Sequence, residues 1–176
     1  QLIIEADGGS RGNPGIAAGG AVVIDGESQQ VIASVGVYVG IATNNVAEYN
    51  GLLAGLIKAY EIDPGALVHV RMDSKLVVEQ MSGRWKIKHP DMAVLAAKAK
   101  DVIGNRAVTY EWVPRLQNAL ADAAANKSMD FRESFDSFCF FFVWAKSSSN
   151  VAGYFFQSSY LTNKSDSINS SSASSS

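Results

Sequence analysis

The sequence predicts an α/β domain built on a mixed five-stranded sheet flanked by helices, with the element order βββαβααβα. Two observations support this fold class. Three apolar or β-branched runs come first, separated by turn formers, and two further runs then alternate with stretches of helical apolar spacing. Consecutive strands followed by alternating strands and helices indicate antiparallel pairs extended by parallel ones, with helices on the faces of the sheet.

The first three strands are separated by turn residues. Residues 2–6 form an apolar run that ends at Asp7, and residues 8–15 are almost all turn formers, so we expect a strand followed by a tight loop. Two β-branched runs follow at residues 21–24 and 31–39, and the turn formers between them predict an antiparallel hairpin.

Helices and strands alternate in the rest of the predicted domain. The first helix begins at Asn45, which can cap it, and ends near the breaker Asp63-Pro64-Gly65. Apolar spacing bounded by Gly and Pro then predicts a strand at 67–72, a short helix at 75–81, a helix at 90–104, a strand at 108–113 and a last helix at 118–127.

The composition changes near residue 130. All eight Phe and the single Cys lie after that position, whereas fourteen of the fifteen Gly lie before it. Residues 131–176 contain fifteen Ser and no persistent period, so we predict one domain, 1–130, and a Ser/Phe-rich tail, 131–176, that is disordered or non-native. The aromatic run 138–144 has high strand propensity and is the part of the tail that could dock on the domain.

Charge and cysteine content narrow the possible settings. The net charge is −2, so no overall basic excess attracts nucleic acid, and a partner of that kind must be held by a local patch or through bound cations. One Cys excludes an internal disulfide framework and a Cys-cluster zinc site. No signal peptide or run of about 20 apolar residues is visible. We expect a cytoplasmic monomer without membrane association or an obligate protein partner.

Four carboxylates stand at the edges of predicted elements. Asp7 and Asp73 end apolar strands, while Glu48 and Asp122 lie in the first turns of helices. Each has a local explanation. Asp7 could be a turn former, and Asp73 could cap the helix that follows it. Glu48 could be the capping-box partner of Asn45, and Asp122 could be a solvated helix residue. Glu48 nevertheless falls on the apolar stripe of its helix, where an uncompensated carboxylate is costly. If the first and fourth strands are neighbours, Asp7 and Asp73 meet at one sheet edge within reach of Glu48.

Converging carboxylates indicate a metal site. Their mutual repulsion raises their pKa values unless divalent cations neutralise them. Oxygen ligands without a Cys or His cluster point to a hard ion, Mg²⁺ or Mn²⁺. Two such ions suit phosphoryl transfer, because they activate a water on one side of a phosphodiester and stabilise the leaving oxygen on the other.

Four motifs resemble, in order, those of the type 1 ribonuclease H family: DGGSRGNPG at 7–15, ATNNVAEY at 42–49, MDS at 72–74 and NALAD at 118–122. The resemblance covers about residues 1–130 and is strongest to the N-terminal domain of actinobacterial proteins that continue into a histidine-phosphatase-like domain. It implies a ribonuclease-H-like fold and endonucleolytic cleavage of the RNA strand of RNA/DNA hybrids, leaving 5′-phosphate and 3′-hydroxyl ends. It places two Mg²⁺ ions, replaceable by Mn²⁺, on Asp7, Glu48, Asp73 and Asp122.

The resemblance also indicates further site residues. Arg115 takes the approximate place of a family His; because Arg cannot shuttle a proton, we expect it to bind a phosphate or help expel the product. Residues implied to contact substrate are Gly8, Gly9, Asn13, Asn44, Asn45 and Asn118, together with Arg84, Trp85 and Lys86 of a short basic loop. Simpler explanations stay open, namely helix capping for Asn44 and Asn45, a turn for Asn13 and a core plug for Trp85. The alternatives for function are a nuclease of the same superfold with another nucleic-acid substrate and a non-catalytic hybrid-binding module.

Overall fold

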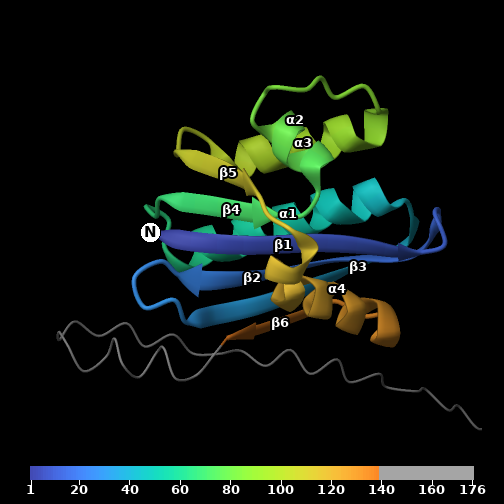
Figure 1. The fold of residues 1–176 in the computed structure, drawn as a ribbon, viewed down its shortest axis with the longest axis horizontal. Coiled ribbons are helices and arrows are strands. Elements are labelled where there is room, and N and C mark those ends of the chain that lie inside the picture. The colour runs from blue at the N-terminus through green and yellow to red at the C-terminus, as the bar shows by residue number, and fades with distance from the viewer. Residues whose placement is uncertain (139–176) are drawn as a thin grey trace, which may run out of the picture.

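A six-stranded mixed sheet forms the centre of the molecule (Figure 1). The computed structural model describes residues 1–138. The strands are β1 (Leu2–Arg11), β2 (Gly15–Asp25), β3 (Val31–Ala42), β4 (Val68–Met72), β5 (Val108–Trp112) and β6 (Phe135–Phe138), and their order in the sheet is β5-β4-β1-β2-β3-β6. Strands β1 to β3 form an antiparallel meander, β4 and β5 run parallel to β1, and β6 is antiparallel to β3. The predicted fold class and element order are therefore confirmed, with one strand more than predicted.

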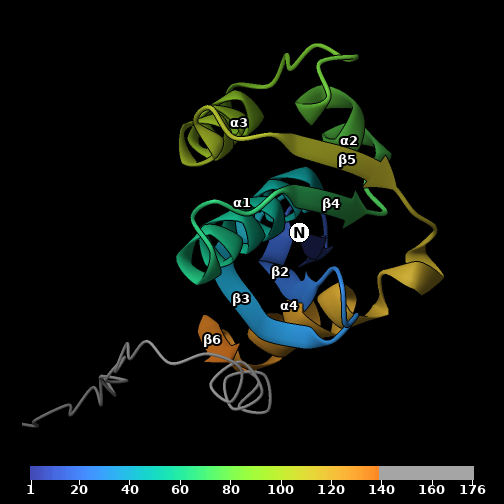
Figure 2. The ribbon, with the colours of Figure 1, turned by 90° about the vertical axis from the view of Figure 1, so that its left-hand side faces the viewer.

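The helices lie on both faces of this sheet (Figure 2). They are α1 (Asn44–Ile62), α2 (Lys75–Met81), α3 (Pro90–Ile103) and α4 (Ala119–Phe131), and a short 3-10 helix, η1 (Arg115–Gln117), precedes α4. Two adjacent glycines of β2 show how the faces are divided. A Cβ atom on Gly19 would meet α1 at Gly51, and one on Gly20 would meet α4 at Ala125. Since successive side chains of a strand point to opposite faces, α1 and α4 sandwich the centre of the sheet.

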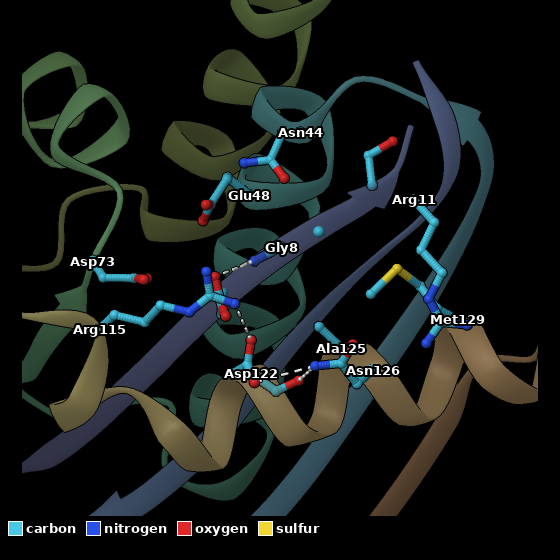
Figure 3. Close-up of a pocket in the computed structure, with 13 residues that line it drawn as sticks. Gly8, Arg11, Asn44, Glu48, Asp73, Arg115, Asp122, Ala125, Asn126 and Met129 are labelled. Carbon is cyan, nitrogen blue, oxygen red and sulfur yellow. Dashed lines mark hydrogen bonds and ion pairs between the residues drawn. The ribbon is translucent and has the colours of Figure 1, made fainter. Parts of the chain in front are cut away.

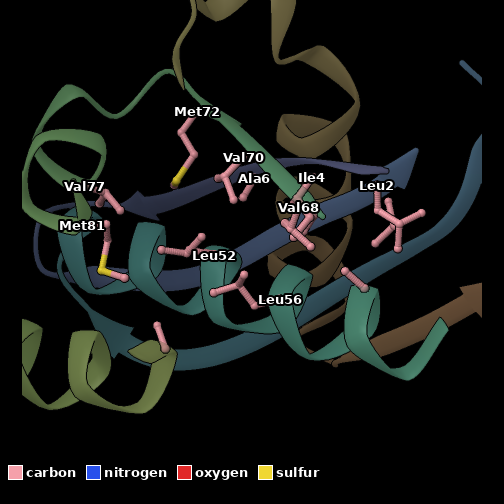
Figure 4. Packing of buried hydrophobic residues seen from close by; sticks show 14 of the residues in the cluster. Leu2, Ile4, Ala6, Leu52, Leu56, Val68, Val70, Met72, Val77 and Met81 are labelled. Atoms are coloured by element: carbon pink, nitrogen blue, oxygen red, sulfur yellow. The ribbon is translucent and has the colours of Figure 1, made fainter. Parts of the chain in front are cut away.

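The main core fills the space between the sheet and α1, with α2 and α3 closing it (Figure 4). Alternate residues of the central strands point into it, as the period of a half-buried strand requires: Leu2, Ile4 and Ala6 from β1, and Val68, Val70 and Met72 from β4. Helix α1 supplies Leu52 and Leu56, both fully buried. Among the described residues, no helix is long and apolar enough to cross a membrane.

The loop predicted after Asp7 is instead a continuation of strand. β1 runs on to Arg11, and its glycine segment pairs with the beginning of β2 through Gly8↔Gly19 and Arg11↔Ile16. These paired segments are rich in glycine because α1 and α4 approach the sheet too closely for side chains. Turn-forming composition therefore reflects close packing of helices on this segment, and only residues 12–14 form the actual turn.

Strand β6 lies beyond the predicted domain boundary at residue 130. It pairs with β3 through Ala33↔Phe138 and Gly36↔Phe135, so the sheet extends to residue 138. Lys58 of α1, only 4% exposed, forms ion pairs with Asp136 of β6 and with Glu61. Two predictions concern the tail: that it is disordered or non-native, and that its aromatic run could dock on the domain. Apart from β6, both fall on residues 139–176, which lie outside the described part of the chain.

Candidate active site

Two of the four predicted carboxylates follow the point where neighbouring parallel strands separate. β1 pairs with β4 as far as Ala6 and Met72, and the next residues are Asp7 and Asp73. The first and fourth strands are therefore neighbours, which is the condition under which Asp7 and Asp73 are expected to meet. Because this pairing stops there, both aspartates lie at an open edge between the strands, which is where ligands bind in sheets of this kind.

Helix α1 brings Glu48 to the same edge. The helix begins at Asn44, and the Thr43 side chain caps it by accepting a hydrogen bond from the backbone N–H of Val46 at 3.4 Å. The predicted cap at Asn45 and the capping-box role for Glu48 are therefore wrong, since Glu48 lies beyond the first turn. Carboxylate oxygens of Asp7, Glu48 and Asp73 all lie within 4.8 Å of one another.

The fourth predicted carboxylate, Asp122, stands across the pocket on α4 (Figure 3). Two side chains hold it in place. The Nη2 of Arg115 in η1 donates to its Oδ1 at 3.1 Å, and the Nδ2 of Asn126, one helical turn further on, donates to its Oδ2 at 3.1 Å. The guanidinium of Arg115 is largely exposed, so it faces both this carboxylate and the opening of the pocket.

Burial and crowding make the ionised carboxylates costly. Burial, and secondarily the charge of Asp73, raises the pKa of Asp7 to about 7. Burial, and secondarily the charge of Asp7, raises the pKa of Glu48 to about 9, with Arg115 opposing the shift. The Oε2 atom of Glu48 is buried and has no hydrogen-bond donor. A buried carboxylate oxygen without a donor requires either a proton or a cation.

The donor set fits a hard divalent cation. Asp7, Glu48 and Asp73 offer carboxylate oxygens at close quarters, and the residues that line the pocket include neither Cys nor His. Mg²⁺ and Mn²⁺ favour oxygen ligands of this type, whereas zinc favours Cys and His. The unpartnered Oε2 of Glu48 is the atom that such an ion would satisfy.

The carboxylates line one end of a pocket of about 350 Å³. Of the residues predicted to contact substrate, Gly8, Gly9 and Asn44 line it as well. Five lining residues were not predicted from the sequence: Ser10, Arg11, Ala125, Asn126 and Met129. Asn126 could have been found, because it lies four residues after Asp122 on the same helix face. Arg11 could not, because its segment reads as a loop.

The other predicted substrate contacts do not line the pocket. Asn13 lies in the turn after β1, where its Oδ1 accepts a hydrogen bond from the backbone N–H of Asn44 at 3.1 Å. Asn45 is exposed at the start of α1. The basic loop that joins α2 to α3 is exposed, and Trp85 is 45% exposed, so the core-plug explanation for Trp85 is wrong.

Asn118 lies beneath the carboxylates and has no exposed surface. Its Nδ2 donates to the carbonyl oxygen of Ala6 at 2.8 Å and to Oδ1 of Asp73 at 2.9 Å. A buried side chain with these partners has no face for a nucleic acid. The structure thus corrects the predicted substrate contact at Asn118.

The sheet topology and the carboxylate cluster at the end of its central strands define a ribonuclease-H-like protein. The chain belongs to the reverse transcriptase-like family, whose profile matches residues 5–128. It is 53% identical over 131 residues to the bifunctional protein Rv2228c of Mycobacterium tuberculosis, an alignment that covers 74% of this chain and 36% of that relative. The chain therefore spans little more than a third of that relative's length.

Solved structures agree with this assignment. The N-terminal RNase H domain of Rv2228c, solved as a fusion with maltose binding protein, superimposes with a TM-score of 0.70 at 53% identity and covers 74% of this chain and 94% of that one. LC11-RNase H1, solved in complex with an RNA/DNA hybrid, has a TM-score of 0.70 at 36% identity and covers 75% of this chain and 99% of that one.

Proposed function

We propose that this chain is a metal-dependent endonuclease that hydrolyses the RNA strand of RNA/DNA hybrids, leaving 5′-phosphate and 3′-hydroxyl ends. The observation that carries the proposal is the convergence of three carboxylates within 4.8 Å in an open pocket, with one buried oxygen lacking a donor. The similarity to LC11-RNase H1, which was solved with a hybrid, supports the choice of substrate.

The proposed metal ligands are Asp7, Glu48, Asp73 and Asp122, holding two Mg²⁺ ions that Mn²⁺ can replace. Bound ions supply Lewis acidity that activates a water and stabilises the leaving oxygen. The chain's own part is to hold the four carboxylates in place. Asp7 is held through its Oδ1, which accepts the backbone N–H of Gly8 at 2.8 Å, and Asp122 is held by Arg115 and Asn126.

Arg115 has a second part in this proposal. A guanidinium stays protonated near neutral pH, so it does not accept or donate the proton of the reaction. It is exposed at the opening of the pocket and binds a carboxylate there. The same donors bind phosphate oxygens, so Arg115 is suited to hold the scissile phosphate or the cleaved product.

The surface around the carboxylates is suited to reading a hybrid. Gly8, Gly9 and Asn44 present backbone and amide groups in the pocket, which can both donate to and accept from a 2′-hydroxyl. We assign Asn13 and Asn45 to the same groove beside the pocket. The exposed basic loop, with Arg84, Trp85 and Lys86, supplies the separate grip on the DNA-strand backbone. We place the protein in the cytoplasm as a monomer. Sedimentation velocity of the purified chain would check the monomeric state.

One assay tests the proposal and its alternatives. The protein is incubated with labelled RNA/DNA hybrid, double-stranded RNA and duplex DNA, with and without Mg²⁺. We expect hybrid cleavage only, with Mg²⁺, and complete loss in Asp7→Asn and Asp73→Asn. The control variant is Asp63→Asn, at the exposed end of α1, which should cleave normally. Cleavage of another substrate, or hybrid binding without cleavage, would replace the proposal by one of the alternatives, and full activity in Asp7→Asn would contradict the site.

A further inference from the structure

We propose that Asn118 is a positioning residue that sets the spacing and orientation of the metal-binding carboxylates. This inference rests on the proposed function, but it concerns a residue that touches neither substrate nor reacting atoms. Asn118 is fully buried, and it lies directly before α4 and after η1, at the junction of the elements that build the pocket.

The side chain of Asn118 ties two ligand-bearing strands together. One amide group donates to the carbonyl of Ala6, the residue before Asp7, and to Oδ1 of Asp73. The donor distances of 2.8 and 2.9 Å are those of normal hydrogen bonds. Both acceptors are oxygens without a hydrogen to donate, so Asn118 must turn the NH₂ end of its amide toward them.

The backbone of Asn118 forms hydrogen bonds to two further site residues, Asp122 and Arg115. Its carbonyl accepts the N–H of Asp122 at 3.1 Å, and its N–H donates to the carbonyl of Arg115 at 3.0 Å. One residue therefore contacts β1 beside Asp7, the carboxylate of Asp73, the first turn of α4 and the turn that carries Arg115. A shift of Asn118 would move these groups relative to one another.

The hydrogen bond from Asn118 fixes the orientation of the Asp73 carboxylate, which lies beside Asp7 and Glu48. Like charges at this spacing repel, and a neutral donor beneath one of them holds it without adding charge. Carboxylates held within a fraction of an ångström bind a metal more tightly than mobile ones, because less ordering accompanies binding.

Two variants separate a positioning role from a role in folding. Asn118→Ala removes the donor, and Asn118→Asp keeps the shape but places a carboxylate against two acceptors. Asn50→Ala is the matched control: its Nδ2 bonds within α1 to the carbonyl of Val46, away from the pocket lining. Circular dichroism establishes which variants are folded, and calorimetric titration measures Mg²⁺ and Mn²⁺ affinity without any substrate.

For both Asn118 variants we expect metal affinity to fall by 10- to 100-fold, the usual effect of removing a residue that orients metal ligands. We also expect a lower kcat, an unchanged KM for hybrid and a half-maximal Mg²⁺ concentration raised in step with the lost affinity, with Asn50→Ala unaffected. Wild-type affinity in folded Asn118→Ala, or no folded variant of either kind, would overturn the inference. Failure of the wild-type chain to cleave hybrid would refute the proposed function alone, because the calorimetric comparison stands without it.

Discussion

At the scale of single residues, the site contains buried carboxylates whose ionised forms are energetically unfavourable. Asp7 and Glu48 are each 6% exposed, and both carry raised pKa values because burial removes water from their carboxylates. Arg115, the cation beside them, is exposed and hydrogen-bonds Asp122 instead. The metal-free protein therefore has an energetic strain that bound divalent cations would relieve.

This cost predicts a pH dependence of stability in the metal-free protein. The pKa of Asp7 is about 7 in the folded state against 3.8 for an ordinary Asp, so the folded state binds more protons between those values. Stability from this group is thus complete below about pH 4 and is lost as pH rises to about 7. In EDTA, we expect the melting temperature of Asp7→Asn to exceed that of wild type by a margin that grows across this window.

The free-energy difference behind this margin is bounded by the size of the pKa shift of Asp7. At about 1.4 kcal/mol per pKa unit, that bound is on the order of 4 kcal/mol. Thermal melts at intervals of half a pH unit would measure it. Saturating Mg²⁺ serves as the control, because it should stabilise wild type more than the variant and so narrow the margin. A margin that is constant from pH 4 to 8 would contradict the assigned burial of Asp7.

At the scale of elements, the contact between β1 and α1 decides where Glu48 lies. A Cβ atom on Gly8 would stand 2.1 Å from the backbone nitrogen of Glu48 and 2.2 Å from the carbonyl carbon of Ala47. Only a glycine permits this approach without movement of the helix. The sequence pattern predicts the glycine segment but not this contact, because the residues of the two elements are about forty positions apart.

Gly8→Ala should therefore push α1 away from the sheet. We expect the free energy of unfolding to fall by about 1–3 kcal/mol or more, the range for overpacked sites, as measured by urea denaturation. Gly65→Ala is the matched control, since its nearest new contact is 3.6 Å away and surface changes of this kind stay within about 0.5 kcal/mol. Equal stability of the two variants would show that α1 does not pack on Gly8 as described.

The basic loop between α2 and α3 gives a second element-scale prediction. Arg84 and Lys86 are exposed, and Arg84 pairs with Glu79, so neither residue has a buried structural role. Removing each charge should weaken hybrid binding in EDTA and lower the slope of log affinity against log salt by about 1, as loss of one phosphate contact does. Fluorescence anisotropy at several salt concentrations measures both the affinity and the slope.

Lys98→Ala is the control, because Lys98 is exposed on α3 outside the loop and its loss should leave the slope unchanged. An unchanged slope in Arg84→Ala and Lys86→Ala would show that the loop does not contact the hybrid.

At the scale of the whole molecule, the sheet is extended at one edge by β6. Its Asp136 forms an ion pair with Lys58, and the ammonium group of Lys58 also makes a cation–π contact with the ring of Phe138. The ring of Phe135 makes a second cation–π contact, with Lys127 of α4. Lys58 is almost completely buried, so its charge depends on partners that come partly from this strand. We propose that the folded domain extends beyond residue 130, at least as far as residue 138.

Truncation tests this proposal. A chain ending at residue 132 should melt at a lower temperature than one ending at residue 138, since each kcal/mol lost lowers Tm by roughly 2–8 °C in domains of this size range. Asp136→Asn is the point control, because it weakens the Lys58 ion pair and keeps the strand. Identical melting of the two truncated chains would show that β6 contributes nothing to stability.

The sequence alone predicted the fold class and the order of the elements, because apolar periods are local. It also singled out four carboxylates, of which the structure brings Asp7, Glu48 and Asp73 together. Tertiary structure alone decided that Asn118 is buried under those aspartates, that the glycine segment is strand and that β6 joins the sheet. Each of these depends on contacts between residues far apart in the chain, such as Asn118 with Ala6 and Gly36 with Phe135. Local residue preferences carry no record of such contacts, since they arise only when separate elements pack together.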